Sequence, residues 1–261
     1  MANNQIVIIG AGNLATNIAQ VFYEKISKEI HIHSRTEGAA KLLANKINAP
    51  SYSFDVNDIP FDANLYIISI SDDAISEIVN NKTLKEKINN NLVVHTAGSI
   101  QANILEKLSA NFGIFYPLQT FSRFKKANFK NIPLCLEANS GFNYNRISKI
   151  AFQISEDVRK INFEQRKYIH LAAVFANNFS NNMFAIAEEI LKEKDIDFDI
   201  LLPLINETVA KIQKESPKKV QTGPAVRKDT KVMNKHLELL KDNTNLQNIY
   251  KFVSKNIEET K

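Results

Sequence analysis

The chain has 261 residues, of which 44% are hydrophobic and 23% charged, as expected for a folded protein of one large or two modest domains. No apolar run approaches the roughly 18 residues of a membrane helix, and no secretion leader is evident, so we expect a cytoplasmic protein with no membrane partner. The net charge of +5 comes from scattered lysines, so nucleic-acid binding is not expected, although a basic surface favours anionic small molecules.

Short β-rich runs alternate with helical patterns in the first part of the chain, as in a doubly wound, mostly parallel α/β sheet covered by helices. The candidate strands are residues 5–9, 30–33, 65–70, 92–95, 113–116, 133–136 and 158–161. The candidate helices between them are residues 14–26, 37–47, 74–79, 102–108 and 144–154. The single cysteine, Cys135, lies in an alternating stretch that favours a small buried side chain over a metal ligand, and no metal site is expected.

Strand patterns stop near residue 162. Residues 163–192 repeat apolar positions every three or four residues without proline or glycine, which predicts one long helix. Further helices are predicted over residues 198–214, 230–240 and 246–257. The sequence therefore predicts two domains, a nucleotide-binding domain over residues 1–162 and an all-α domain over residues 163–261.

A glycine-rich turn joins the first strand to the first helix, in the strand-turn-helix context that a dinucleotide-binding site requires. Gly10 permits the tight turn, Gly12 lets the backbone approach a pyrophosphate, and Ala15 is the third small residue. The residues expected to contact the cofactor here are Gly10, Ala11, Gly12, Asn13 and Leu14. The alternative is a glycine-rich turn that binds no ligand.

The end of the second strand indicates which dinucleotide binds. An NAD site usually has an Asp or Glu there, whereas this chain has Ser34, Arg35 and Thr36, which are suited to a 2′-phosphate. We therefore predict NADP, with NAD or a deazaflavin as alternatives. Arg35 is alternatively a solvated side chain, with Thr36 acting only as a helix cap.

Two later strand ends are expected to border the nicotinamide half of the cofactor, because ligands lie beyond the carboxyl ends of parallel strands. The cofactor-binding candidates there are Ser69, Ser71, Thr96, Ala97 and Gly98. His95 precedes the second group and is a candidate acid or base, or alternatively a packed histidine bonded to backbone.

The long helix carries a second polar group. His170, Ala173 and Asn177 lie on one helical face, with Asn178 beside them, and the alternative is a packing or solvent-facing stripe. Gln119, Asn178 and Arg227 are candidate substrate ligands. A turn with an aromatic anchor explains Gln119 nearly as well, and pairing with Asp229 explains Arg227 at least as well.

With these motifs in view, the chain resembles a bacterial family described as a Rossmann-like domain joined to a domain of unknown function, number 2520. The resemblance covers essentially the whole chain and is carried by several motifs. They are residues 10–15, 71–75, 95–99, 117–121 and 170–178, and 222–224 with Arg227 and Asp229. The chain departs from the family at Tyr116, where histidine is usual, and at Lys228, where glycine is usual.

More distantly, the architecture is similar to that of pyrroline-5-carboxylate reductase and of the 6-phosphogluconate and β-hydroxyacid dehydrogenases. This similarity implies a Rossmann-type domain, a helical domain like the C-terminal domain of 6-phosphogluconate dehydrogenase, and a homodimer formed through the helical domains. Ala173 occupies the position of the lysine that the hydroxyacid dehydrogenases use, which argues against a lysine-assisted alcohol oxidation.

Two functions follow as hypotheses. The first is an NADP(H)-dependent oxidoreductase for a small carbonyl, imine or alcohol substrate bound between the domains, with His170 and His95 as acid or base candidates and Asn177 orienting the substrate. The second is a non-catalytic sensor or scaffold that binds NADP.

Overall fold

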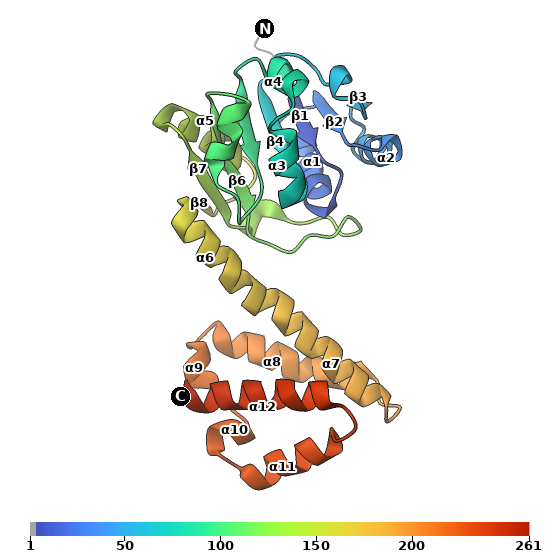
Figure 1. The fold of residues 1–261 in the computed structure, drawn as a ribbon, viewed down its shortest axis with the longest axis vertical. Coiled ribbons are helices and arrows are strands. Elements are labelled where there is room, and N and C mark those ends of the chain that lie inside the picture. Colours follow the sequence, from blue (N-terminus) through green and yellow to red (C-terminus); the bar gives the residue numbers. More distant parts are fainter. Residues whose placement is uncertain (1–3, 261) are drawn as a thin grey trace. The chain divides into compact units, whose positions relative to one another are not determined.

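The computed structural model describes residues 4–260 and divides into two compact units, residues 1–181 and 182–261 (Figure 1). Residues 1–3 and 261, which the two predicted domains include at their outer ends, lie outside the described residues. The predicted domain boundary after residue 162 stays a prediction. The last strand ends at Lys160, but the first unit continues to residue 181 because the helix that follows is anchored to the sheet.

The first unit is built on an eight-stranded sheet with the order β3-β2-β1-β4-β5-β6-β7-β8. The strands are β1 (Ile6–Ile9), β2 (Ile30–His33), β3 (Ser51–Ser53), β4 (Leu65–Ile68), β5 (Leu92–His95), β6 (Phe112–Pro117), β7 (Leu134–Ala138) and β8 (Val158–Lys160). Neighbouring strands are parallel except β6 and β7, which are antiparallel. The predicted doubly wound, mostly parallel sheet is confirmed.

Helices cover both faces of this sheet, because its central strands are buried on both sides. Ile6 and Ile8 of β1 pack in one apolar cluster, and Val7 and Ile9 in the other. The first cluster includes residues of α1 (Asn13–Lys25), α2 (Glu37–Ile47) and α5 (Gly141–Ala151). The second includes residues of α3 (Asp72–Ile78), α4 (Lys82–Ile88) and the 3₁₀ helix Ala102–Lys107. The single cysteine, Cys135, is buried in the second cluster, as expected.

Several short elements are absent from the sequence prediction, and β3 and α4 are examples in the first unit. β3 has only three residues, Ser51–Ser53, and its polar composition gives no strand pattern. α4 buries only Leu84 and Ile88, which is too short a repeat to recognise from spacing. The segment predicted as an α-helix over 102–108 forms a 3₁₀ helix instead.

The predicted long helix over residues 163–192 is helical throughout but not regular. It consists of α6 (Phe163–Ala173), a π-helical segment (Val174–Phe179) and α7 (Ser180–Lys192). A capping box of Asn162 and Gln165 starts α6. The π-helical segment widens the helix at the residues singled out as candidate ligands.

The second unit is all helical, as predicted. Beyond the end of α7 it contains α8 (Leu202–Ile212), α9 (Pro217–Val220), α10 (Pro224–Arg227), α11 (Thr230–Leu239) and α12 (Thr244–Glu259). A 3₁₀ turn, Phe198–Leu201, precedes α8, so the helix predicted over 198–214 begins as a tighter coil.

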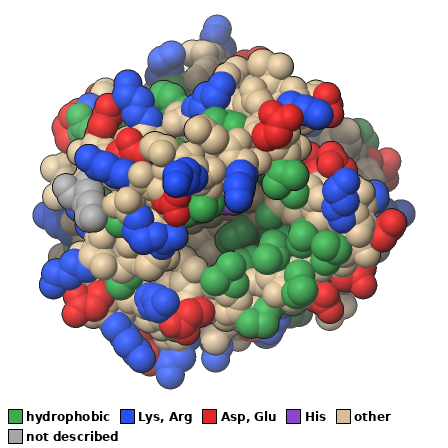
Figure 2. Space-filling view, turned by 90° about the horizontal axis from the view of Figure 1, so that it is seen from below, with side chains coloured by type: hydrophobic (Ala, Val, Ile, Leu, Met, Phe, Trp, Pro, Cys, Tyr) green, Lys and Arg blue, Asp and Glu red, His purple; other side chains and the backbone are tan. Residues whose placement is uncertain are grey.

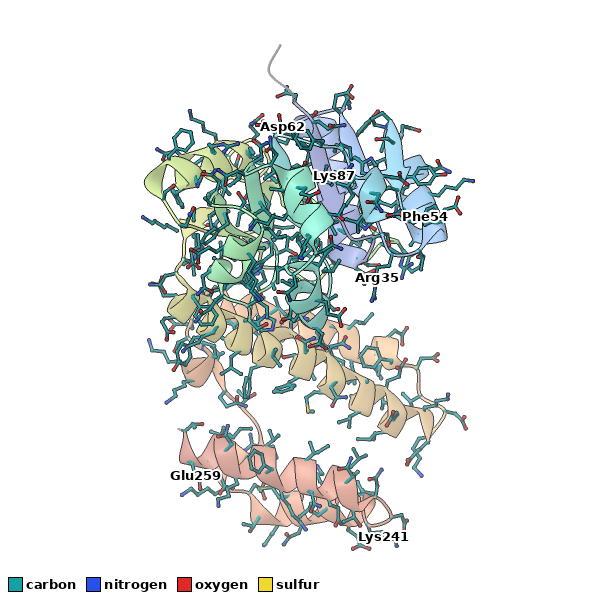
Figure 3. The ribbon with its side chains drawn as sticks, turned by 45° about the horizontal axis from the view of Figure 1, so that its top comes forward. Arg35, Phe54, Asp62, Lys87, Lys241 and Glu259 are labelled. Carbon is teal, nitrogen blue, oxygen red and sulfur yellow. The ribbon has the colours of Figure 1, made fainter. Side chains whose placement is uncertain are left out.

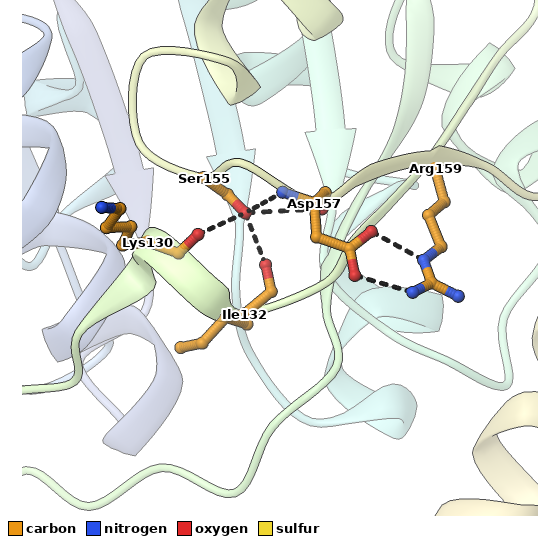
Figure 4. A network of polar contacts seen from close by, with 5 residues as sticks. All are labelled: Lys130, Ile132, Ser155, Asp157 and Arg159. Carbon is orange, nitrogen blue, oxygen red and sulfur yellow. Dashed lines mark hydrogen bonds and ion pairs between the residues drawn. The ribbon is translucent and has the colours of Figure 1, made fainter.

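A polar network holds the segment that leads into β8 (Figure 4). The Ser155 hydroxyl donates to the Ile132 carbonyl at 2.7 Å and accepts from the Asp157 N–H at 3.0 Å. The Asp157 carboxylate in turn accepts two hydrogen bonds from Arg159, each of 2.7 Å. The Arg159 guanidinium holds the pKa of Asp157 below its usual value through this hydrogen bond. The network fixes β8 beside β7 at the edge of the sheet.

Lys and Arg side chains are spread over the face shown in Figure 2, with Asp and Glu between them and a group of hydrophobic side chains on one side. Among residues 4–260, no helix combines the length and the apolar character needed to cross a membrane.

The core makes a direct stability prediction. Phe22 is fully buried and meets Phe115 edge to face at 5.6 Å between ring centroids. We expect Phe22→Ala to lower the free energy of unfolding by about 3–5 kcal/mol, because it leaves a cavity. Urea unfolding followed by circular dichroism measures this change. The control is Phe124→Ala, which removes a ring that is 91% exposed. A loss of similar size in the control would contradict the burial argument.

Candidate functional site

The turn after β1 has the backbone geometry of a dinucleotide-binding loop. Gly10 has φ +126°, and a Cβ there would lie 2.1 Å from the Ser69 carbonyl oxygen, so only glycine fits. Gly12 caps α1 without a side chain, and a Cβ built on it meets nothing within 4 Å. The first N–H groups of α1 therefore remain accessible to an anion. Ala15 is fully buried at the close approach of helix and sheet.

A cavity of about 540 Å³ opens over this turn and over the carboxyl ends of the neighbouring strands. All the predicted cofactor-binding residues except Thr36 line it. They are Gly10, Ala11, Gly12, Asn13, Leu14, Ser34, Arg35, Ser69, Ser71, Thr96, Ala97 and Gly98. The strand ends β1, β2, β4 and β5 thus contribute to one hollow, as the sheet topology requires.

Arg35 lines this cavity and projects from the loop after β2 (Figure 3). Its side chain is exposed, and none of the described carboxylates pairs with it. Thr36 occupies the N-cap position of α2, but its side chain makes no capping hydrogen bond. The guanidinium is therefore available to a ligand anion, whereas Thr36 lies outside the cavity lining.

Two histidines that the sequence reasoning passed over share one face of β2. His33 lines the cavity, and its Nδ1 lies 3.0 Å from the Ser53 hydroxyl, which also meets His31 Nε2 at 2.9 Å. Burial lowers the pKa of both rings, that of His31 to about 4. The alternation Ile30-His31-Ile32-His33 is the sequence signal that places both rings on one face.

Hydroxyl contacts join the ends of β4 and β5. Thr96 Oγ1 donates to Ser69 Oγ at 3.2 Å, and Ser99 Oγ donates to the Asp72 carboxylate. Ser71 is the N-cap residue of α3, and its side chain makes no capping bond. The two strand-end loops are thus tied together while Ser71 remains at the cavity wall.

His170 meets the loop after β5 at close range. A Cβ on Gly98 would lie 2.8 Å from His170 Nδ1, so the loop passes the imidazole only because residue 98 is glycine. The same Nδ1 lies 3.1 Å from the Tyr116 hydroxyl, and the two rings are arranged edge to face. Burial raises the pKa of Tyr116, which keeps its hydroxyl protonated at neutral pH. In the sequence, Tyr116 stands out only as a departure from the family pattern.

Arg166 anchors the start of α6 and was not singled out from the sequence. It is fully buried, pairs with Glu137 of β7, and donates to the Ile100 carbonyl at 2.6 Å. Its Nε atom has no hydrogen-bond partner among the described groups. One turn later on the same helix, His170 is thereby held against Gly98. An arginine one turn before a candidate histidine was the only sequence signal.

His95 is placed differently from the other candidates. It is fully buried, it lies outside the lining of the cavity, and both ring nitrogens meet backbone groups. The Ala97 N–H donates to Nδ1 at 3.1 Å, and Nε2 lies 3.3 Å from the Gln101 carbonyl oxygen. This placement corresponds to the packed-histidine alternative. The ring shapes the turn that presents Thr96, Ala97 and Gly98.

A second cavity, of about 700 Å³, adjoins the first. The two share Asn13, Leu14, Tyr116 and His170 as lining residues. The predicted ligands Gln119, Asn177 and Asn178 line the second cavity, and Ala173 lies among them. The helical face inferred from the spacing of His170, Ala173 and Asn177 therefore borders one hollow.

Arg227 belongs to the second unit, where it ends α10 and is exposed. Asp229, its suggested partner, instead accepts a hydrogen bond from the Val232 N–H as the cap of α11. The role of Arg227 as a substrate ligand stays a prediction.

The fold and the glycine turn define the class, a Rossmann-type dinucleotide-binding protein with a helical C-terminal region. Residues 132–257 match the domain of unknown function 2520, and residues 1–96 match the shikimate/quinate 5-dehydrogenase family. A Bacteroides fragilis protein provisionally assigned as an NADP oxidoreductase is 43% identical, with 98% of each chain covered and a TM-score of 0.92. The chain belongs to the family of that protein, as the resemblance predicted.

More distant solved structures share the fold. An imine reductase from Myxococcus stipitatus is 13% identical with a TM-score of 0.65, over 98% of this chain and 92% of that one. A pyrroline-5-carboxylate reductase from Coxiella burnetii is 15% identical with a TM-score of 0.61, over 99% and 97%. A segment of 53 residues is 40% identical to glutamyl-tRNA reductase from Methanococcus aeolicus, but it spans only 14% of that relative and 20% of this chain.

The burial of His95 predicts a dependence of stability on pH. Desolvation lowers its pKa from 6.5 to about 4, so between these values the unfolded chain takes up a proton that the folded chain does not. The free energy of unfolding should therefore fall as the pH falls from about 6.5 to about 4. In His95→Gln this decline should be smaller, with His31 and His33 retaining the rest. Urea unfolding at a series of pH values measures it.

The control is His170→Gln, because that side chain is exposed. Identical pH profiles for wild type and His95→Gln would contradict the prediction.

Proposed function

We propose that the protein is an NADP(H)-dependent oxidoreductase that acts on a small carbonyl, imine or alcohol substrate. The observation that carries this proposal is that Tyr116 and His170 line both the first cavity, which has the dinucleotide-binding turn, and the second cavity beside it. The designation of the Bacteroides fragilis relative and the enzyme names of the distant structures support it. A sensor that binds NADP without catalysis would need no second cavity beside the cofactor cavity, because it would bind no substrate.

The residues of the first cavity fit a pyridine dinucleotide. Gly10 and Gly12 leave the turn open to a pyrophosphate, and the start of α1 offers it unpaired N–H groups. Arg35 offers a charge-assisted contact to a 2′-phosphate, which favours NADP over NAD. A bound NADP(H) would supply or accept the hydride. A deazaflavin remains an alternative ligand for the same non-acidic loop.

His170 is the proposed acid or base. It lines both cavities, and its exposed ring leaves Nε2 free to exchange a proton with the reacting oxygen or nitrogen. Tyr116 fixes the ring through Nδ1 and so acts as a positioning residue. Asn177 would orient the substrate from the π-helical segment. We leave His95 out of the catalytic set because both its ring nitrogens are used by backbone groups.

We also propose that the helical region forms a homodimer, in keeping with the predicted role of residues 163–261. Within the described part of the second unit, only Ala225 and Ser254 are buried. Large apolar side chains remain exposed there, with Leu204 at 64%, Leu239 at 82% and Phe252 at 77%. Such exposure is typical of a surface covered by a partner.

The cofactor assignment predicts a specific loss of affinity. We expect Arg35→Ala to weaken NADP⁺ binding about 10- to 100-fold, because it removes a charge-assisted contact. NAD⁺ binding should be unchanged, and calorimetric titration measures both. Lys41→Ala, an exposed change on α2 outside the cavity lining, is the matched control. An unchanged NADP⁺/NAD⁺ affinity ratio would defeat the assignment.

The catalytic assignment predicts a loss of turnover without a loss of cofactor. We expect His170→Gln to lower kcat by about 10²- to 10⁴-fold, the usual contribution of a general acid or base. Tyr116→Phe should cost less and should shift the pH profile of kcat/KM, because the His170 ring loses its partner. NADPH oxidation with a panel of ketones, aldehydes and cyclic imines measures both.

Any substrate turned over by the wild type excludes the non-catalytic sensor. Normal turnover in His170→Gln, with NADP⁺ still bound, would remove His170 from the mechanism.

A further inference from the structure

Tyr116 and His170 are the only ionisable side chains on the described walls of the second cavity. Its described lining contains no Lys, Arg, Asp or Glu side chain, although 23% of the whole chain is charged. Its apolar surface comes from Leu14 of α1, Leu118 and Phe121 after β6, and Ile169 and Val174 of the long helix. A cavity with these walls favours apolar groups.

Apart from His170, its polar groups are amides and hydroxyls, and they lie on three segments. Gln119 Oε1 accepts the Thr120 N–H at 2.9 Å, and Asn13 Oδ1 accepts the Arg123 N–H at 3.2 Å, so the NH₂ groups of both amides remain for a ligand. The side chains of Asn177 and Asn178 have no hydrogen-bond partner within the described part of the chain. These amides lie on the π-helical segment, a form of helix often found at functional sites.

The chemistry of these walls selects against anions. A carboxylate or phosphate that leaves water for such a cavity loses its hydration, and the described walls offer it no Lys or Arg side chain in return. A neutral carbonyl, imine or hydroxyl group instead finds amide donors and acceptors.

We propose that the second cavity takes an uncharged, largely apolar ketone, aldehyde or cyclic imine, and that it discriminates against carboxylate- and phosphate-bearing analogues. This proposal rests on the proposed oxidoreductase function and narrows its substrate class. The shared wall of Tyr116 and His170 would place the reacting carbonyl or imine end of the ligand toward the first cavity.

Matched probes test the proposal on the full-length wild-type protein loaded with NADP⁺. Cyclohexanone is compared with 3-oxocyclohexanecarboxylate, and 4-phenylbutan-2-one with its ring carboxylate. Titration calorimetry then measures binding whether or not turnover occurs. We expect each neutral ketone to bind at least about tenfold more tightly than its carboxylate, a difference of about 1.4 kcal/mol. Equal or tighter binding of the carboxylates overturns the proposal, and so does failure of both neutral ketones to bind.

Two charge-matched variants sharpen the test. Ala173→Lys places a cation on the cavity wall and should improve carboxylate binding about tenfold. Leu171→Lys adds the same charge to the neighbouring residue, which is exposed and outside this lining, and should have little effect. An equal gain in both variants overturns the proposal, because it would show that the cavity wall is not the point of contact.

Two further readouts separate the possible failures. A carboxylate preference that disappears in Arg227→Ala overturns the proposal in favour of Arg227 as the ligand. Absence of NADP⁺ binding to the wild type would defeat the proposed function itself, whereas intact NADP⁺ binding with a carboxylate preference defeats only the substrate class.

Discussion

The ion pair of the buried Arg166 with the partly exposed Glu137 is the contact on which the candidate site depends. Taking a guanidinium out of water is costly unless charges and hydrogen bonds replace its hydration. Here the Glu137 carboxylate and the Ile100 carbonyl do so, and they belong to β7 and to the loop after β5. The start of the long helix is therefore fixed to β7 and to the loop after β5, in which Thr96, Ala97 and Gly98 line the first cavity. Because His170 lies one turn after Arg166 on the same helix, this ion pair also fixes the position of His170.

Parallel strands explain how residues far apart in the sequence meet. The carboxyl ends of β1, β2, β4 and β5 lie at one edge of the sheet, so each loop that follows a strand adds a few residues to the same hollow. β7 breaks the pattern by running antiparallel to β6. Its carboxylate, Glu137, can therefore meet a helix that the sequence places almost thirty residues later.

Local patterns predicted the sheet, the glycine turn and the helical second part, because each depends on neighbours in the sequence. Gly10 is an example, since a strand, a turn and a helix follow one another there. The pairs Tyr116–His170 and Arg166–Glu137 were missed because the spacing of one partner says nothing about the other. Short elements such as β3 carry too few residues for a pattern. His95 shows the opposite kind of error. A polar residue at a strand end predicts a role in the site, but both ring nitrogens of His95 meet backbone groups.

The π-helical segment has a geometric consequence for everything that follows it. In a regular helix, each residue turns the direction of the side chain by about 100° about the helix axis. The wider π-helical turn changes this angle, so the side chains that follow it point in directions that a regular helix would not give them. Deleting one residue between Val174 and Phe179 would restore a regular helix. Either the two asparagines or the side chains of α7 would then rotate about the helix axis, away from their present directions. The π-helical turn thus lets one continuous helix direct the side chains before it and those after it to different sides.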